Sequence, residues 1–288
     1  MVLHIAYIVG GDAWYECFAS IASLLDNNNK NKFHIHIISE EEYNKDFFQN
    51  IEYLNNIHGK FDITFIHVPG NKFDCLPDSN ISRIPKGVNI KLLLGDLLPE
   101  DVTRVLYLDS DTIVKEDILP IMNEDISDYV VAAAPDYWNS VAGLNVSLEK
   151  RYFNAGVMYI NIKKWRNENI ASRSIEFIEK YNPYSNEQTA LNAVLHRDNN
   201  VKIISPIWNF PPNTDLVKDG NIDIDYTKIK ILHYASTSPW RDGSDSECDI
   251  WENYYKLTDY TATYANFEPT FIKRVALGIC KYLKLVHR

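Results

Sequence analysis

Short runs of β-branched and other apolar residues alternate with helix-like segments along the chain, and this alternation limits the fold more than any other feature. The runs lie at residues 3–9, 33–39, 61–68, 104–109, 129–134 and 156–162. Helical spacing of apolar residues is found between several of them, notably at 12–28 and 41–57. Strand followed by helix predicts βαβ units, and therefore an α/β fold with a mostly parallel, Rossmann-like sheet flanked by helices. Such sheets bind ligands at the carboxyl ends of their strands.

Composition narrows the class of protein further. The 288 residues are 45% apolar and 24% charged, which fits an ordinary soluble domain, and no run of 18 apolar residues predicts a membrane span. A net charge of -10 argues against a nucleic-acid partner, because phosphate backbones favour clustered Lys and Arg. Four cysteines without CxxC spacing predict a reducing cytoplasm and no cysteine-based zinc site. They are Cys17, Cys75, Cys248 and Cys280.

The last residues differ in charge from the rest. Residues 269–288 contain five Lys or Arg and no acid, so the remainder carries -15, that is -10 minus +5. At 100° per residue the basic side chains gather on one side of a helix and the apolar ones on the other. We therefore expect residues 1–265 to form the main domain and 266–288 a basic amphipathic tail that contacts an anionic membrane surface. The alternative is a helix packed on the domain.

The stretch RVLYLDSDTIV ends an apolar run on two acids, Asp109 and Asp111. If the segment is extended, residues i and i+2 share a face, so both carboxylates aim at one point past the strand. At about 4 Å they repel by roughly 4 kcal/mol at an effective dielectric near 20. We expect either a positive group between them or protonation of one acid. Asp223 and Asp225 have the same spacing without an apolar run before them and are expected to have no role.

A divalent ion on oxygen ligands at a strand end suggests a phosphate or diphosphate substrate. Two enzyme classes fit this chemistry. Dehalogenase-like phosphatases carry an apolar strand, DxD and Thr, whereas GT-A type glycosyltransferases use DxD to hold a metal on the diphosphate of a nucleotide sugar. The first 100 residues resemble a nucleotide-binding half placed ahead of the motif, which favours the second class.

RYFNAGVMYINIKKWR, residues 151–166, resembles glycosyltransferase family 8, in which F-N-[AS]-G-V, an apolar strand and a K-K-W-R helix start follow the DxD at a similar interval. The resemblance runs from about Leu3 to Trp240. It implies a GT-A type fold and retaining transfer of a hexose, from UDP-glucose or UDP-galactose, to an oligosaccharide or lipid-linked glycan acceptor. It also implies lipopolysaccharide or other surface polysaccharide synthesis at the cytoplasmic face of the bacterial inner membrane. A nucleotide-sugar-binding protein without transfer activity stays open as an alternative.

The resemblance implies that Asp109, Asp111 and His233 hold Mn²⁺ or Mg²⁺, a set of two oxygens and one nitrogen that suits these ions. KILHYASTSPW resembles the family's H-x-x-G-x-x-K-P-W motif, but the Gly is absent and Ser238 stands where the Lys is expected. Arg241 is the candidate replacement for that charge. A purely structural strand-end role is the alternative for His233.

The remaining site residues also follow from the resemblance. Gly11, Asp12 and, less directly, Trp14 are implied to meet the nucleotide, Lys91 and Ser110 the phosphates and sugar, and Asn154 and Ala155 the donor sugar. Glu187 is implied to bind sugar hydroxyls and Gln188 to lie near the anomeric carbon, so Gln188, Glu187 and Asp111 are the catalytic candidates. The alternatives are a core aromatic at Trp14, a solvated lysine at Lys91, a local turn at Asn154 and a helix cap at 187–188.

Overall fold

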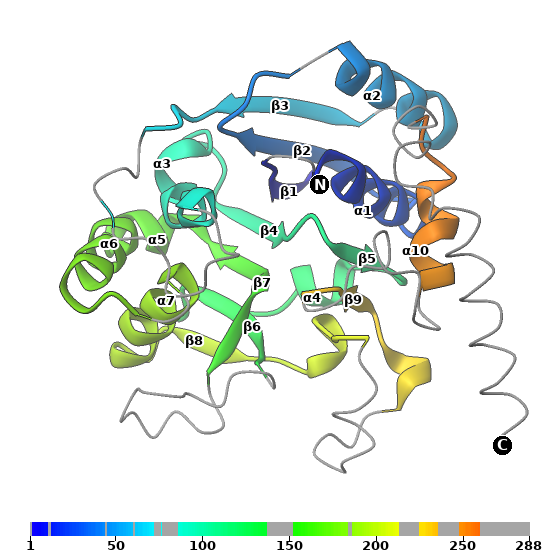
Figure 1. Cartoon of the computed structure of the whole chain (residues 1–288). Coiled ribbons are helices and arrows are strands. Elements are labelled where there is room, and N and C mark those ends of the chain that lie inside the picture. The colour runs from blue at the N-terminus through cyan, green and yellow to red at the C-terminus, as the bar shows by residue number, and fades with distance from the viewer. Residues whose placement is uncertain are drawn as a thin grey trace, which may run out of the picture.

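The structure is a computed structural model, and it describes residues 2–10, 13–43, 45–59, 61–71, 76, 86–136, 152–183, 186–212, 225–235 and 248–259. In these residues a seven-stranded sheet has the order β3-β2-β1-β4-β7-β6-β8 (Figure 1). Its strands are β1 (Val2–Ile8), β2 (Lys32–Ser39), β3 (Asp62–His67), β4 (Arg104–Leu108), β6 (Val131–Pro135), β7 (Phe153–Asn161) and β8 (Val201–Ile203). A second sheet pairs β5 (Thr112–Val114) with β9 (Ile231–His233).

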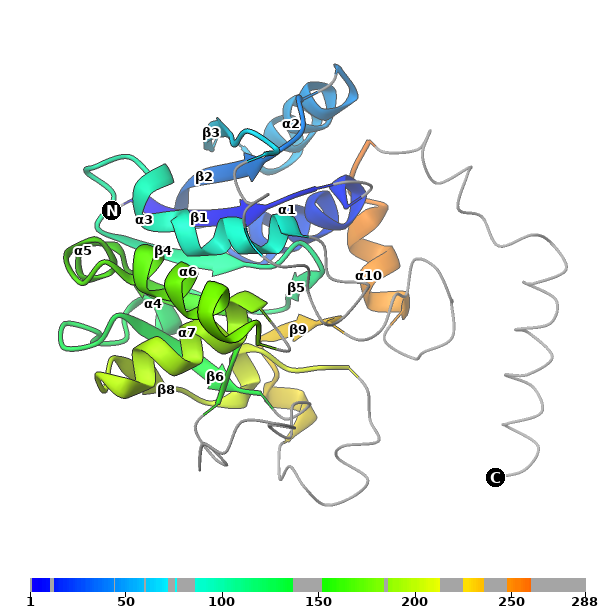
Figure 2. The same cartoon turned by 60° about the vertical axis from the view of Figure 1, so that its left-hand side comes forward.

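Helices cover both faces of the large sheet (Figures 1 and 2). The α-helices are α1 (Trp14–Asn27), α2 (Lys45–His58), α3 (Leu94–Leu97), α4 (Leu119–Met122), α5 (Ile162–Asn167), α6 (Ile170–Tyr181), α7 (Asn186–Arg197) and α10 (Cys248–Tyr255). The 3₁₀ segments are η1 (Lys86–Leu93), η2 (Pro206–Trp208) and η3 (Tyr226–Lys228). The predicted α/β class with a mostly parallel sheet is confirmed, because within the large sheet only β7 runs against its neighbours.

Side-chain alternation along the strands divides the interior into two apolar cores, one on each face. Ile5 and Tyr7 of β1 pack in the core that α1, α2 and α10 cover. Ala6 of the same strand lies in the other core, beneath α3, α5, α6 and α7. Strands buried on both faces are expected to read as nearly continuous apolar runs, which explains why β1, β2, β4, β6 and β7 could be found in the sequence, whereas the edge strand β3 is only partly buried.

The antiparallel direction of β7 determines which residues meet at the functional edge of the sheet. β7 pairs with β4 so that Leu108 lies opposite Val157. The amino end of β7, with Asn154 and Gly156, therefore lies beside the carboxyl end of β4, and Asp109 N–H donates to the Gly156 carbonyl at 2.8 Å. Residues far apart in the sequence reach one edge in this way.

No helix among the described residues is long and apolar enough to cross a membrane. The predicted tail, 266–288, and the proposed domain boundary before it fall outside the described ranges. The basic amphipathic helix and its membrane contact therefore stay predictions.

Candidate functional site

Two acids and one histidine converge just past the end of β4. The His233 Nε2 atom lies 3.2 Å from Asp111 Oδ1 and 3.6 Å from Asp109 Oδ2. One ligand atom from each of the three side chains lies within 4.8 Å of the other two. The predicted extended geometry is wrong, because residues 110–111 form a turn in which Thr112 N–H and its hydroxyl both donate to the Asp109 carbonyl. The turn, rather than strand alternation, brings the carboxylates together.

Pairing of β5 with β9 brings His233 to the acids. Thr112 lies opposite His233 in the antiparallel register, and Tyr234 N–H donates to the Asp111 carbonyl at 2.9 Å. The short strand β5 is in turn held by α1, through a 2.9 Å hydrogen bond between Ser20 and Thr112 hydroxyls. The convergence is therefore built into the backbone.

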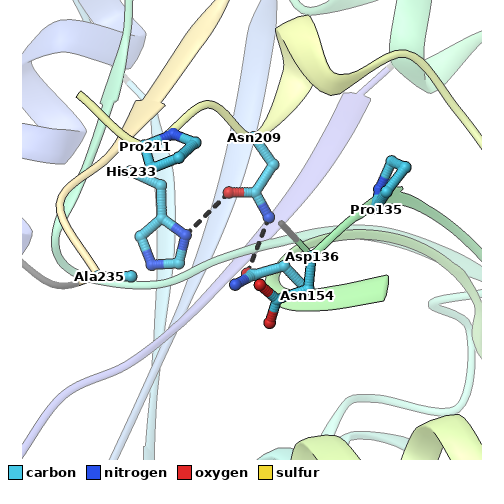
Figure 3. Close-up of a pocket in the computed structure, with 7 residues that line it drawn as sticks. All are labelled: Pro135, Asp136, Asn154, Asn209, Pro211, His233 and Ala235. Atoms are coloured by element: carbon cyan, nitrogen blue, oxygen red, sulfur yellow. Dashed lines mark hydrogen bonds between the residues drawn. The ribbon is translucent and has the colours of Figure 1, made fainter. Parts of the chain in front are cut away.

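Two asparagines fix the ring of His233. Its Nδ1–H donates to Asn209 Oδ1 at 2.8 Å, and Asn209 Nδ2 donates to Asn154 Oδ1 at 2.9 Å (Figure 3). The neutral tautomer that donates from Nδ1 leaves Nε2 without a proton, as a metal ligand must, whereas the protonated ring can donate from Nε2 to Asp111. Asn154 Oδ1 also accepts Gly156 N–H at 2.8 Å, which confirms the local-turn alternative, while the predicted contact of Asn154 with the donor sugar stays a prediction.

Lys91 is buried, so the alternative of a solvated helix lysine is wrong. Its ammonium lies 3.1 Å from Asp109 Oδ1 and 3.7 Å from Glu187 Oε1, and 4.8 Å from the centre of the Tyr107 ring. Tyr107 donates its hydroxyl to Asp109. The positive group expected beside the two acids is therefore present in the chain itself, although it reaches only one of them.

The charged groups of the site shift one another's pKa values. Burial alone would raise the pKa of Asp109, but Lys91 and His233 outweigh it and lower that pKa. Burial opposes the charged forms of Lys91 and His233, yet the neighbouring carboxylates raise the pKa of both. Burial raises the pKa of Glu187 despite the nearby Lys91 ammonium.

Gln188 is held at both ends of its amide. Its Oε1 accepts Ala155 N–H at 3.0 Å, and its Nε2 donates to Asp136 Oδ2 at 2.7 Å. Glu187 and Gln188 lie in the first turn of α7, and the Glu187 carboxylate accepts backbone N–H groups there, which agrees with the helix-cap alternative. A position at the helix start is compatible with the predicted donor-binding role of both residues, which stays a prediction.

A cavity of about 540 Å³ opens beside these residues. Ser110, Lys91 and Glu187 line it together with both acids and the carboxyl end of β1. The volume suits a ligand of nucleotide-sugar size. Trp14 instead packs edge-on against Phe47 and Tyr43, as the core-aromatic alternative expects.

Four predicted features lie outside the described residues, namely Gly11, Asp12, Ser238 and Arg241. Asp225, from the second acidic pair, is exposed and caps η3 by accepting Thr227 N–H at 3.0 Å. This is a local structural contact, and its neighbour in the motif, Asp223, lies outside the described residues.

The group formed by Asp109, Asp111 and His233, here called the acidic triad, has the donor set and charge for a divalent cation. Three carboxylates, Asp109, Asp111 and Glu187, against the Lys91 ammonium leave about -2 with His233 neutral (-3 plus +1). Two carboxylates and an oriented imidazole are ligands that Mn²⁺ and Mg²⁺ accept. The residues present therefore fit such an ion.

Sequence reasoning missed Asn209 and Asp136, which support His233 and Gln188. Asp136 directly follows β6, so it reaches the same edge of the sheet as Asp109. An acid immediately after an apolar strand was the available signal for it. Asn209 follows a 3₁₀ turn and has no comparable signal in the sequence.

Comparison with known proteins shows which family the chain belongs to. The family model described as glycosyl transferase family 8 matches residues 4–244. General stress protein A of Bacillus subtilis is 32% identical over 218 residues, 69% of this chain and 73% of that protein. A lipopolysaccharide 1,2-glucosyltransferase of Escherichia coli is 28% identical over 270 residues, 84% of this chain and 74% of that protein.

The fold has solved counterparts. The galactosyltransferase LgtC, in complex with donor and acceptor sugar analogues, superposes with a TM-score of 0.76 at 23% identity, covering 92% of this chain and all of LgtC. This similarity establishes the GT-A type fold and, with the family match, argues against a dehalogenase-like phosphatase. The chain belongs to glycosyltransferase family 8.

Proposed function

We propose that this glycosyltransferase is a metal-dependent, retaining enzyme that transfers glucose or galactose from a UDP-sugar to a glycan acceptor. The observation that carries the proposal is the convergence of Asp109, Asp111 and His233, because both aspartates line the 540 Å³ cavity. A diphosphate is anionic and would be repelled by this acidic edge unless a cation lay between them. The net charge near -2 therefore supports a divalent ion as part of donor binding.

Asp109, Asp111 and His233 would hold Mn²⁺ or Mg²⁺. When bound, the ion would offset the negative charge that develops on the diphosphate of the departing UDP. The role of Asn209 is to keep the His233 imidazole in the tautomer that offers Nε2. The buried ammonium of Lys91 adds a second fixed positive charge toward the same part of the cavity.

Gln188 is proposed to orient the donor sugar rather than to attack it. An amide is a poor nucleophile, and both ends of this one are already bonded to Ala155 and Asp136. A fixed amide dipole near the reaction centre can favour one sugar orientation without reorganising during reaction. Glu187, whose pKa is raised, and Asn154 complete the proposed sugar pocket.

The choice of glucose or galactose rests on a few hydrogen bonds and stays open between the two. Relatives include a lipopolysaccharide 1,2-glucosyltransferase and, in Salmonella typhimurium, a lipopolysaccharide 1,3-galactosyltransferase. Their names support a role in lipopolysaccharide or other surface polysaccharide synthesis, with an oligosaccharide or lipid-linked acceptor. The proposed location is peripheral at the cytoplasmic face of the inner membrane, through the basic tail.

The decisive experiment measures release of free UDP from a panel of UDP-sugars during a Mn²⁺ titration. We expect turnover with UDP-glucose or UDP-galactose. Asp111→Asn should need a Mn²⁺ concentration at least about tenfold higher for half-maximal activity, because a metal ligand is lost. Asp225→Asn is the matched control, since it alters an exposed acid of the same D-x-D spacing. It should behave as the unmodified chain does.

Two outcomes would count against the proposal. Equal Mn²⁺ dependence of Asp111→Asn and the unmodified chain would remove the metal role. Binding of UDP without turnover of any donor would instead favour a nucleotide-sugar-binding protein.

A further inference from the structure

Three histidines lie together on one face of the sheet, away from the donor cavity. In the parallel register of β1 and β2, His4 lies opposite His34, and His36 lies opposite Ala6 on the same face. Their rings stack, with centroids 4.4 Å apart for His34 and His36 and 5.3 Å apart for His4 and His36. Chain geometry puts His4 about 13 Å before Ile8, where the donor cavity begins, at roughly 3.3 Å per residue.

The ring nitrogens of this histidine cluster converge. His4 Nδ1 lies 3.0 Å from His36 Nε2, and one nitrogen from each of the three rings lies within 4.8 Å of the other two. Zinc with Zn–N bonds near 2.0–2.1 Å separates two nitrogen ligands by about 3.3 Å. The first pair already meets this spacing, and the third needs a ring movement of at most roughly 1.5 Å.

The buried ring of His36 has one nitrogen whose hydrogen bonding is not satisfied. Its side chain is fully buried, and its Nδ1 has no hydrogen-bond partner in the part of the chain that the structure describes. Whichever of His4 and His36 donates between Nδ1 and Nε2, one nitrogen of the His36 ring stays unsatisfied, at a cost of about 1–3 kcal/mol. The deficit lies on Nδ1, so the His36 nitrogen that faces the cluster, and that can ligate an ion there, is Nε2.

The protonation state suits metal binding. Burial, with the neighbouring histidines, lowers the pKa of His36 to about 3, and burial together with His34 also lowers the pKa of His4 despite Asp101. Both rings are therefore neutral at pH 7, the form that ligates metals. His34 has an orienting partner as well, since its Nε2 lies 2.7 Å from Thr64 Oγ1.

We propose that His4, His34 and His36 form a second metal site, which takes Zn²⁺ or a similar late first-row divalent ion and joins β1 to β2. His4 and His34 are only partly buried, so the ion can enter and keep a water as its fourth ligand. Three imidazoles favour Zn²⁺, Ni²⁺ or Cu²⁺, whereas the acidic triad favours Mn²⁺ or Mg²⁺. The two sites thus differ in the class of metal they take.

The test titrates Zn²⁺ into metal-free, full-length Asp111→Asn, in which the acidic triad has lost a ligand, by calorimetry. Co²⁺ is added in parallel, because its visible spectrum distinguishes a tetrahedral nitrogen site from an octahedral oxygen site. We expect one ion per chain, a tetrahedral Co²⁺ spectrum, and a higher temperature of thermal unfolding in zinc. Adding His34→Gln should weaken zinc binding at least tenfold and abolish that spectrum.

His67→Gln is the matched control, because His67 lies exposed at the end of β3 and outside the cluster. It should leave zinc affinity unchanged. His4→Gln provides a second cluster variant if His34→Gln fails to fold, and circular dichroism checks both. Zinc affinity equal in the cluster variants and the control, or no zinc binding at all, would overturn the proposal and leave a stacked cluster only.

Discussion

At the scale of single residues, Gly156 shows why the F-N-A-G-V motif contains a glycine. A Cβ atom built on Gly156 would lie 2.1 Å from Cε1 and 2.8 Å from Nε2 of His233. The imidazole therefore packs directly on the bare backbone of β7, and any larger residue takes the space that the ring needs. The glycine is required for close approach and not for an unusual backbone angle.

Gly156→Ala should consequently weaken Mn²⁺ binding about 10- to 100-fold, the range seen when the support of a metal ligand is lost. Overpacking should also lower the free energy of unfolding by about 1–3 kcal/mol. Mn²⁺ titration by electron paramagnetic resonance measures the first effect and urea unfolding the second. Gly70→Ala is the control, because an added Cβ there meets no atom within 4 Å. An unchanged Mn²⁺ affinity in Gly156→Ala would contradict the proposed role of His233.

The sequence predicted the residues that act through their own chemistry better than those that act through others. Asp109, Asp111 and Lys91 belong to recognisable patterns, and the structure places them together. Asn209 and Asp136 matter because they orient His233 and Gln188. Such contacts depend on where β6, β9 and η2 meet after folding. The apolar strand before Asp136 indicates which edge of the sheet it reaches but not its contact with Gln188, and the neighbours of Asn209 indicate neither.

At the scale of elements, the short helix α5 holds the segment that carries Lys91. Trp165 donates its indole N–H to the Leu92 carbonyl, and its ring packs where Gly95 has no side chain. The Arg166 guanidinium donates to backbone carbonyls from the following stretch. These belong to Gly95, Leu98, Pro99, Glu100 and Val102. Trp165 and Arg166 of the K-K-W-R motif therefore have structural roles.

Arg166→Lys should lower the free energy of unfolding by about 1–3 kcal/mol, because the lysine ammonium cannot replace a planar guanidinium that donates to several carbonyls at once. A displaced η1 should also raise the KM for the donor through Lys91. Urea unfolding and donor kinetics test both effects. Lys163→Arg, an exposed change on the same helix, is the control and should alter neither quantity. If the free energy of unfolding stays within about 0.5 kcal/mol of the unmodified chain, the hydrogen bonds of the Arg166 guanidinium are dispensable for stability.

Element prediction succeeded where a pattern is long and failed where an element is short. The predicted runs at 3–9 and 33–39 match β1 and β2 within about one residue. Strands β5 and β8 have three residues each, too few for an alternating pattern to be visible, whereas the equally short β9 was expected only as the strand that ends at His233. Yet β5 and β9 create the convergence of the acidic triad, so the sequence could suggest the ligands without showing how they meet.

At the scale of the whole molecule, the histidine cluster links stability to pH. The unfolded chain binds a proton at His36 near pH 6.5, but the folded protein holds that ring neutral until about pH 3. The unfolded state therefore binds more protons over this interval, and the free energy of unfolding falls as the pH falls. The slope from this residue approaches roughly 1.4 kcal/mol per pH unit as an upper limit. The lowered pKa of His4 adds to it in the same direction.

We therefore expect the metal-free protein to lose stability between pH 6 and 5, before most carboxylates titrate, and His36→Gln to lose much less over the same range. His233 contributes little in this window, because its pKa is raised and its stabilisation is lost only as the pH rises. Glu187, whose pKa is also raised, is common to both proteins, so the difference between their slopes isolates the cluster. Urea unfolding at several pH values, in the presence of a chelator, measures the slopes, with His67→Gln expected to follow the unmodified chain. Parallel slopes for His36→Gln and the unmodified chain would mean that His36 gains no charge on unfolding, contrary to its burial.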